Sequence, residues 1–228
     1  MNNSPADEKD VKKIIPSRLE RWVQQFLSRH LGKHIPASMT PNQITWIGAG
    51  GSLLGIICAA CTRFSPLFLF GVMAGLVIHL VADDLDGYVA RTRNMTSKAG
   101  AYLDLILDIL HITYLIIALA LAGWVDIKIA LFLTPVYALI IVTCQNYIQY
   151  FQEFLFPRLG PIETHLFFLA LCIAGLIFGK EPLISLGGIG LRAADLIVIG
   201  GGILMYYEMI RMQIELYKRL KQSDEERE

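Results

Sequence analysis

Six long apolar stretches dominate this chain of 228 residues. A helix needs about 20 mostly apolar residues to cross the hydrocarbon core of a bilayer. Because backbone polar groups in that core must be satisfied internally, only helices and closed barrels can span it. The sequence therefore predicts an all-α integral membrane protein. Its six transmembrane helices are expected at about Ile44–Cys61, Pro66–Ala90, Ala99–Leu121, Ile129–Ile148, Ile162–Phe178 and Ala193–Ile214.

The composition agrees with a membrane location. Hydrophobic residues make up 54% of the chain and charged residues 18%, whereas about 25% of the residues of a soluble domain are charged. The four cysteines all lie in apolar stretches, and we interpret them as small apolar side chains rather than as metal or redox sites. The formal net charge is zero, so no nucleic-acid partner is expected.

The distribution of Lys and Arg predicts the orientation of the chain. If both termini lie on one side of the membrane, sixteen of the 20 basic residues lie on that side. Basic residues concentrate in cytosolic loops. Both termini are therefore predicted to be cytosolic, at a prokaryotic plasma membrane or a eukaryotic endomembrane. The polar N-terminus has no basic-then-apolar signal peptide.

The chain divides into three regions. Within the first, a helix at about residues 16–32 carries Leu19, Trp22 and Phe26 on one side and Arg21 and Arg29 on the other. This pattern is typical of a helix that lies in the membrane interface. The regions are a cytosolic N-terminal segment (1–43), a six-helix membrane domain (44–214) and a charged cytosolic tail (215–228).

Four carboxylates lie at helical spacing within the apolar chain. Asp83 and Asp86 share one face of the second predicted helix, and Asp104 and Asp108 share one face of the third. A short link joins these helices, so we expect them to be antiparallel neighbours whose acidic faces meet near the cytosolic side. Four clustered carboxylates repel one another and resist desolvation. Hard divalent cations relieve both costs, so the sequence predicts a metal site.

Glycines and one arginine accompany these acids. Gly87 and Gly100 have no side chain, so a ligand can approach the backbone there. Arg91 lies at the predicted cytosolic rim, where its guanidinium can pair with a carboxylate or bind phosphate. Together with the acids, these residues favour a phosphorylated substrate held by a pair of divalent ions.

These residues form the pattern D-x-x-D-G-x-x-A-R, eight residues, G, three residues, D, three residues, D. Its fixed positions are Asp83, Asp86, Gly87, Ala90, Arg91, Gly100, Asp104 and Asp108. The pattern resembles the signature of the CDP-alcohol phosphotransferase (CDP-alcohol phosphatidyltransferase) family at every fixed position. Eight matches arise by chance in about one of 10¹⁰ windows, if each residue type has a frequency of about one in twenty.

The resemblance implies a reaction in phospholipid synthesis. A CDP-linked alcohol donates its phosphoalcohol group to a second alcohol, and CMP leaves. The resemblance assigns two Mg²⁺ or Mn²⁺ ions to Asp83, Asp86 and Asp104, and it makes Asp108 both the general base and a ligand of the second ion. It also implies a homodimer and a pocket for the cytidine diphosphate moiety. The residues that line this pocket are Gly87, Ala90, Arg91 and Gly100.

The identity of the two alcohols stays open. The donor is CDP-diacylglycerol with a small polar acceptor, or a CDP-aminoalcohol with a diacylglycerol-like acceptor. Either pair brings one membrane lipid and one water-soluble substrate to the cytosolic face. Few basic residues besides Arg91 are expected near the site, which disfavours a phosphorylated acceptor.

Two other classes of protein compete with the transferase. A cation transporter can also carry intramembrane acids, although it would not need Gly87 and Arg91 at these spacings. A membrane scaffold without activity would not need intact metal ligands. Contact with the site competes with helix packing for several nearby polar residues, which are His79, Asp84, His111, Glu163 and His165. Helix packing is favoured for His79 and His111.

Overall fold

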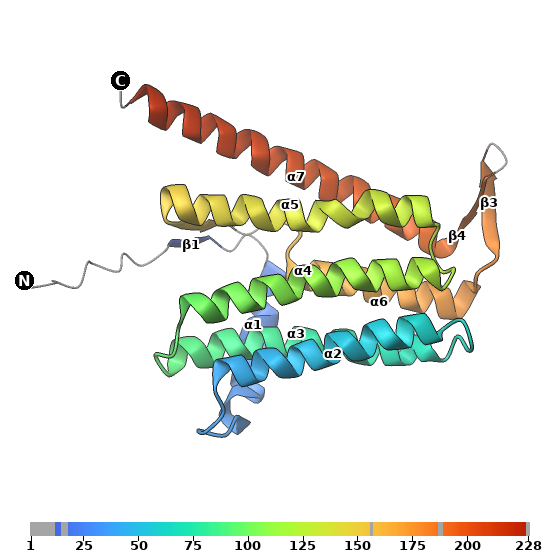
Figure 1. Ribbon diagram of the computed structural model, residues 1–228, viewed down its shortest axis with the longest axis horizontal. Coiled ribbons are helices and arrows are strands. Elements are labelled where there is room, and N and C mark those ends of the chain that lie inside the picture. Colours follow the sequence, from blue (N-terminus) through green and yellow to red (C-terminus); the bar gives the residue numbers. More distant parts are fainter. Residues whose placement is uncertain (1–11, 15–17, 156, 187–188, 227–228) are drawn as a thin grey trace, which may run out of the picture.

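The computed structural model describes residues 12–14, 18–155, 157–186 and 189–226. Within these ranges, six helices are long and apolar enough to cross a membrane (Figure 1). Each overlaps one predicted span, so the predicted all-α membrane fold with an additional N-terminal helix is confirmed. The six helices are α2 (Pro41–Cys61), α3 (Phe68–Thr92), α4 (Lys98–Leu121), α5 (Ile127–Phe151), α6 (Pro161–Phe178) and α7 (Ala193–Glu225).

Shorter elements lie outside the spans. Helix α1 (Arg18–His30) is followed by one 3-10 turn, η1 (Gly32–His34). Strands β1 (Lys12–Ile14) and β2 (Glu153–Leu155) pair in parallel. The α6–α7 connection forms an antiparallel hairpin. Its strands are β3 (Pro182–Leu186) and β4 (Ile189–Arg192).

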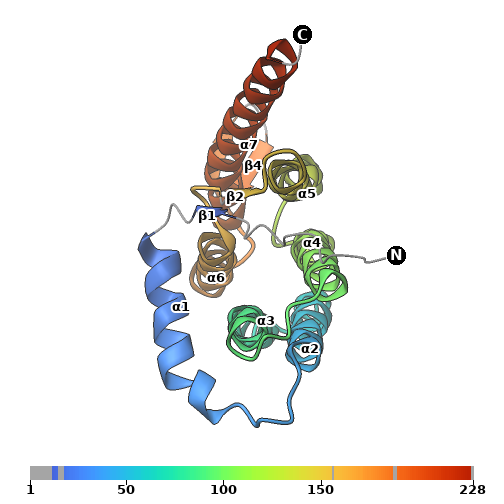
Figure 2. The same cartoon turned by 90° about the vertical axis from the view of Figure 1, so that its left-hand side faces the viewer.

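Helix α1 lies across the bundle. Figure 2 shows α2 to α6 close to end-on, with α1 running across the view beside α3 and α6. Trp22 is 63% exposed and Phe26 is 47% exposed on its outer side. This geometry agrees with the predicted interfacial helix. Residues 16 and 17, where that helix was predicted to begin, lie outside the described ranges, as do residues 1–11.

The ends of the helices follow local sequence signals. Thr40 caps α2, because its hydroxyl accepts a hydrogen bond from the Gln43 amide while the Gln43 side chain accepts one from the Thr40 amide. Ser97 caps α4 by accepting from the amide of Gly100 at 3.0 Å. These caps fix where α2 and α4 begin at the same end of the bundle.

Helix α7 extends beyond the predicted sixth span. We placed the end of the sixth span at Ile214 and assigned residues 215–228 to a tail, but the helix continues to Glu225. Two ion pairs, each between residues one helical turn apart, stabilise this extension. Arg211 contacts Glu215 at 3.2 Å, and Lys221 contacts Glu225 at 3.7 Å.

Glycines allow α2 and α3 to pack closely. A Cβ atom at Gly75 would lie 2.5 Å from the carbonyl oxygen of Gly51 and 2.8 Å from the Cα of Gly55. Only hydrogen fits at such a contact, as in other close pairs of membrane helices. The two backbones therefore approach closely enough for a side chain of α2 to reach the acidic face of α3.

Candidate active site

The acidic faces of α3 and α4 meet as predicted. One carboxylate oxygen from each of Asp83, Asp104 and Asp108 lies within 4.8 Å of the other two. These side chains are half-buried at the wall of a cavity of about 820 Å³. All eight fixed positions of the sequence pattern line this cavity, so residues from two helices form one site.

Asp86 lies beside this group of three but has a different partner. The hydroxyl of Thr45 donates a hydrogen bond of 2.5 Å to Oδ2 of Asp86, and both residues are buried. The same hydroxyl lies 3.2 Å from the carbonyl oxygen of Pro41. Thr45 therefore orients the Asp86 carboxylate from α2. We did not assign this role from the sequence. The sequence shows only that Thr45 lies in the first turns of the span, four residues after Pro41.

The two glycines of the pattern leave space for specific neighbours. A Cβ atom at Gly87 would lie 3.0 Å from Nη1 of Arg91, so the guanidinium can fold back over the helix. A Cβ atom at Gly100 would lie 2.9 Å from Oγ of Ser97 and 3.0 Å from Oδ1 of Asn42. A side chain at either position would therefore crowd these neighbours at the cavity wall.

Arg93 lies close to the pattern but has a structural role. Its guanidinium donates hydrogen bonds to the carbonyl oxygens of Ile35, Pro36, Ala37 and Met39 over 2.8 to 3.4 Å. These bonds tie the segment before α2 to the end of α3. They therefore hold the start of α2, and with it Thr45, against the acidic face.

Helix α1 contributes to the cavity as well. Glu20 and Gln24 line it, and the amide of Gln24 donates a hydrogen bond of 3.0 Å to Glu20. Glu20 is only 3% exposed. From the sequence we assigned this helix to the membrane surface and missed both residues. The available signal was an acid within a helix whose other charged residues are basic.

The charge of the cavity wall is strongly negative. Among its described residues, only Arg91 and Lys98 carry positive charge. Asp84, whose role was open, also lines the wall, whereas Glu163 does not. Glu163 instead caps α6 by accepting a hydrogen bond of 3.0 Å from the amide of Gly160.

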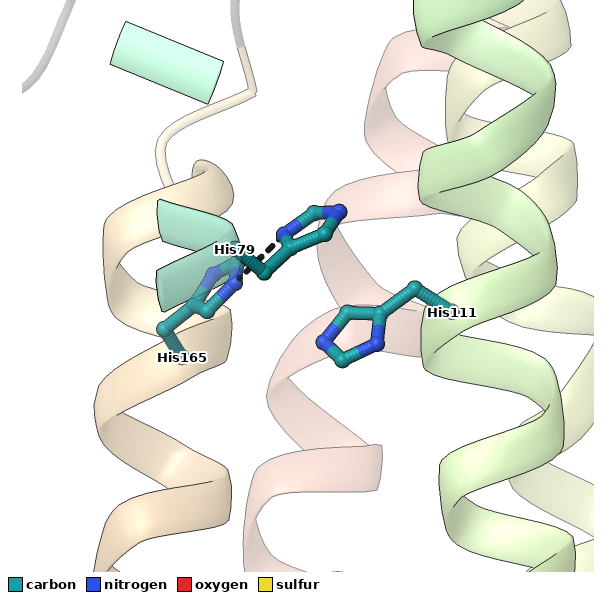
Figure 3. Close-up of side chains that lie close together, drawn as sticks. All are labelled: His79, His111 and His165. Carbon is teal, nitrogen blue, oxygen red and sulfur yellow. Dashed lines mark hydrogen bonds between the residues drawn. The ribbon is translucent and has the colours of Figure 1, made fainter. Parts of the chain in front are cut away.

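Three buried histidines lie next to the acids, one each from α3, α4 and α6 (Figure 3). Nε2 of His79 lies 3.3 Å from Oδ1 of Asp108. Nδ1 of His79 lies 3.1 Å from Nε2 of His165. The ring of His111 stacks on that of His79, with a centroid distance of 4.1 Å. From the sequence we favoured helix packing for His79 and His111, and the direct contact of His79 with Asp108 differs from that expectation.

Comparisons with known proteins agree with the geometry. Residues 38–210 match the family model described as CDP-alcohol phosphatidyltransferase. A bifunctional IPC transferase and DIPP synthase from Aquifex aeolicus is 35% identical over an alignment of 115 residues, and the match covers 46% of this chain and 26% of the relative. The protein of the same name from Thermococcus kodakarensis is 40% identical over an alignment of 118 residues, and the match covers 46% of this chain and 25% of the relative.

An archaetidylinositol phosphate synthase from Pyrococcus horikoshii is 30% identical over an alignment of 112 residues, and the match covers 48% of this chain and 55% of the relative. The matches thus span a quarter to about half the length of these relatives. The family model, in contrast, covers most of this chain and includes every residue of the acidic pattern. The chain therefore belongs to the CDP-alcohol phosphatidyltransferase family, a group of membrane transferases.

Proposed function

We propose that this protein transfers a phosphoalcohol group from a CDP-alcohol to an acceptor alcohol in phospholipid synthesis, and that it releases CMP. The observation that carries the proposal is the meeting of Asp83, Asp104 and Asp108 within 4.8 Å, in a cavity lined by the whole family pattern. A large cavity at one end of a membrane bundle suits a reaction between a lipid and a water-soluble substrate.

The donor set fits divalent metal ions. Carboxylate oxygens are the ligands that Mg²⁺ and Mn²⁺ prefer, and three of them already converge. Asp83, Asp86, Asp104 and Asp108 would hold two such ions. When bound, the ions neutralise the pyrophosphate and stabilise the leaving CMP. The hydroxyl of Thr45 keeps Asp86 turned toward the site.

Asp108 acts as the general base in this proposal. Its carboxylate takes the proton from the hydroxyl of the acceptor as that oxygen attacks the phosphorus of the phosphoalcohol group. A new P–O bond forms to the acceptor, and the bridging P–O bond to CMP breaks. CMP leaves with the electron pair.

Arg91 and the small residues around it bind the donor in this proposal. Gly87, Ala90 and Gly100 leave the backbone of α3 and α4 open to the cytidine diphosphate. The guanidinium of Arg91 lies over Gly87, where it can donate hydrogen bonds to phosphate oxygens.

The acceptor proposed here carries no phosphate. If Arg91 serves the donor, Lys98 is the only cation left among the described residues of the wall, and one lysine is a weak site for a phosphate dianion. The polar residues of the wall include Glu20 and Gln24, which suit hydroxyl or ammonium groups. In this respect the proposal departs from the relative named as a synthase of archaetidylinositol phosphate.

The cytosolic face of the site and a homodimer are also proposed. The orientation is supported by the location of sixteen of the 20 basic residues on the side of the termini. The dimer is supported by family resemblance. Mass measurement of the detergent-solubilised protein tests the dimer, and labelling of single cysteines at the α3–α4 link in sealed vesicles tests the orientation.

Release of labelled CMP tests the reaction. The purified protein is given CDP-diacylglycerol or CDP-choline, with and without Mg²⁺ or Mn²⁺, and a panel of acceptors that includes inositol, inositol phosphate, glycerol phosphate and diacylglycerol. We expect metal-dependent release that Asp108→Asn abolishes. Glu181→Gln, which changes an exposed acid outside the cavity, serves as the control. Absence of release with every pair, together with cation flux in proteoliposomes, would favour the transporter.

A further inference from the structure

Asp108 has a buried histidine as its neighbour. Nε2 of His79 lies 3.3 Å from Oδ1 of Asp108, and the two side chains are 6% and 15% exposed. The histidine comes from α3 and the aspartate from α4. In the proposed function Asp108 is a carboxylate and can only accept, so Nε2 of His79 is the donor across this contact.

His79 is itself held from its other side. Nδ1 of His165 donates a hydrogen bond of 2.8 Å to the carbonyl oxygen of Pro161, because that oxygen can only accept. Nε2 of His165 is then free to accept from Nδ1 of His79, which lies 3.1 Å away. The imidazole of His79 is thus fixed in its plane, with its remaining nitrogen facing Asp108. A continuous series of contacts links the α4 carboxylate to the first turn of α6.

An aspartate in this cluster needs such a partner. Rotation about the Cβ–Cγ bond of aspartate is soft, and neighbouring carboxylates repel one another. Asp83 and Asp104 lie within 4.8 Å of Asp108. The contact of Oδ1 with His79 opposes rotation of the Asp108 carboxylate away from them.

We infer that His79 is a positioning residue for Asp108. Its imidazole, fixed by His165 and Pro161, holds the Asp108 carboxylate in the orientation that the transfer requires. The inference rests on the role of Asp108 in the proposed function. His111 has a different role from His79, because its ring nitrogens have no hydrogen-bond partner in the described part of the chain. His111 stacks on His79 and supports its ring by packing alone.

Two substitutions at one position test the inference. The amide group of glutamine occupies the place of Nε2 of histidine, and that of asparagine occupies the place of Nδ1. His79→Gln therefore keeps a donor at Asp108, whereas His79→Asn keeps only the contact toward His165. We expect His79→Asn to lower kcat about 10–100-fold, the usual loss when an orienting partner of a ligand is removed. The donor KM should change little, and His79→Gln should keep most of the activity.

The control is His111→Phe, which preserves a stacked ring and should leave kcat within about threefold, because only packing changes. Thermal stability is measured for all three variants. Equal loss in His79→Gln and His79→Asn, with equal losses of stability, would show a packing role and refute the inference. Wild-type activity in both would refute it as well.

Metal content closes the test. The three histidines each offer a nitrogen within 4.8 Å of the others, a set that suits Zn²⁺ rather than Mg²⁺. One equivalent of zinc in the purified protein, lost in His111→Phe, would show a metal centre and overturn the inference. If the wild-type protein releases no CMP from any donor, the proposed function fails. If it does release CMP, the results for the variants test only the role of His79.

Discussion

The hydrogen bond from Thr45 to Asp86 offers a direct test of how the site is prepared for metal. Thr45→Val removes the hydroxyl and keeps the shape of the side chain. The lost bond is 2.5 Å long, and both partners are less than 10% exposed. Solvent therefore cannot replace it easily. A hydrogen bond to a charged group contributes about 1.5–3 kcal/mol.

This energy predicts a measurable loss of metal affinity. A factor of ten corresponds to about 1.4 kcal/mol. The bond already holds Asp86 in place without metal, so its loss leaves the metal to order this carboxylate and weakens Mn²⁺ binding by at most about 10–100-fold. The independent range for removing a partner of a metal-ligating carboxylate is also about 10–100-fold. We expect the Mn²⁺ midpoint for CMP release from Thr45→Val to rise by this factor, while kcat at saturating Mn²⁺ changes less.

Thr45→Ser is the matched control, because it keeps the hydroxyl that donates to Asp86. Its Mn²⁺ midpoint should stay close to that of the wild-type protein. Calorimetric titration with Mn²⁺ checks the same affinity without turnover. An unchanged midpoint in Thr45→Val, with a large shift in Asp86→Asn, would refute the reasoning, since Asp86 would then bind metal without help from α2.

Three further predictions concern the surroundings of the site. Gly75→Ala should lower the stability of the bundle by about 1–3 kcal/mol by overpacking. Gly50→Ala should not, because its new methyl group meets nothing within 4 Å. Thermal unfolding in detergent compares the two variants. Glu20→Gln should raise the acceptor KM about fivefold, the equivalent of about 1 kcal/mol for one weakened hydrogen bond, and leave the donor KM unchanged in initial-rate assays. Arg93→Lys should fail to restore the melting temperature lost in Arg93→Ala, because one ammonium cannot reach the four carbonyl groups that the guanidinium contacts.

The spans and the acidic face could be predicted from the sequence, because both depend on the local pattern of residues. A span is a matter of length and apolar content. Helical periodicity places Asp83 with Asp86, and Asp104 with Asp108, before any packing is known. The short link between the two helices then makes them neighbours. The caps at Thr40 and Ser97 depend on residues no more than three positions away.

Contacts between distant helices were decided by the tertiary structure alone. Thr45 reaches Asp86 across 41 residues, and His79 reaches His165 across 86. In a bilayer, the side of a helix that faces lipid and the side that faces protein are both apolar, so the sequence pattern does not fix how each helix is rotated. Glu20 was assigned with its helix to the membrane surface, because the local pattern of α1 does not show which neighbours it packs against. The packing of α1 against α3 and α6 places Glu20 at the cavity wall.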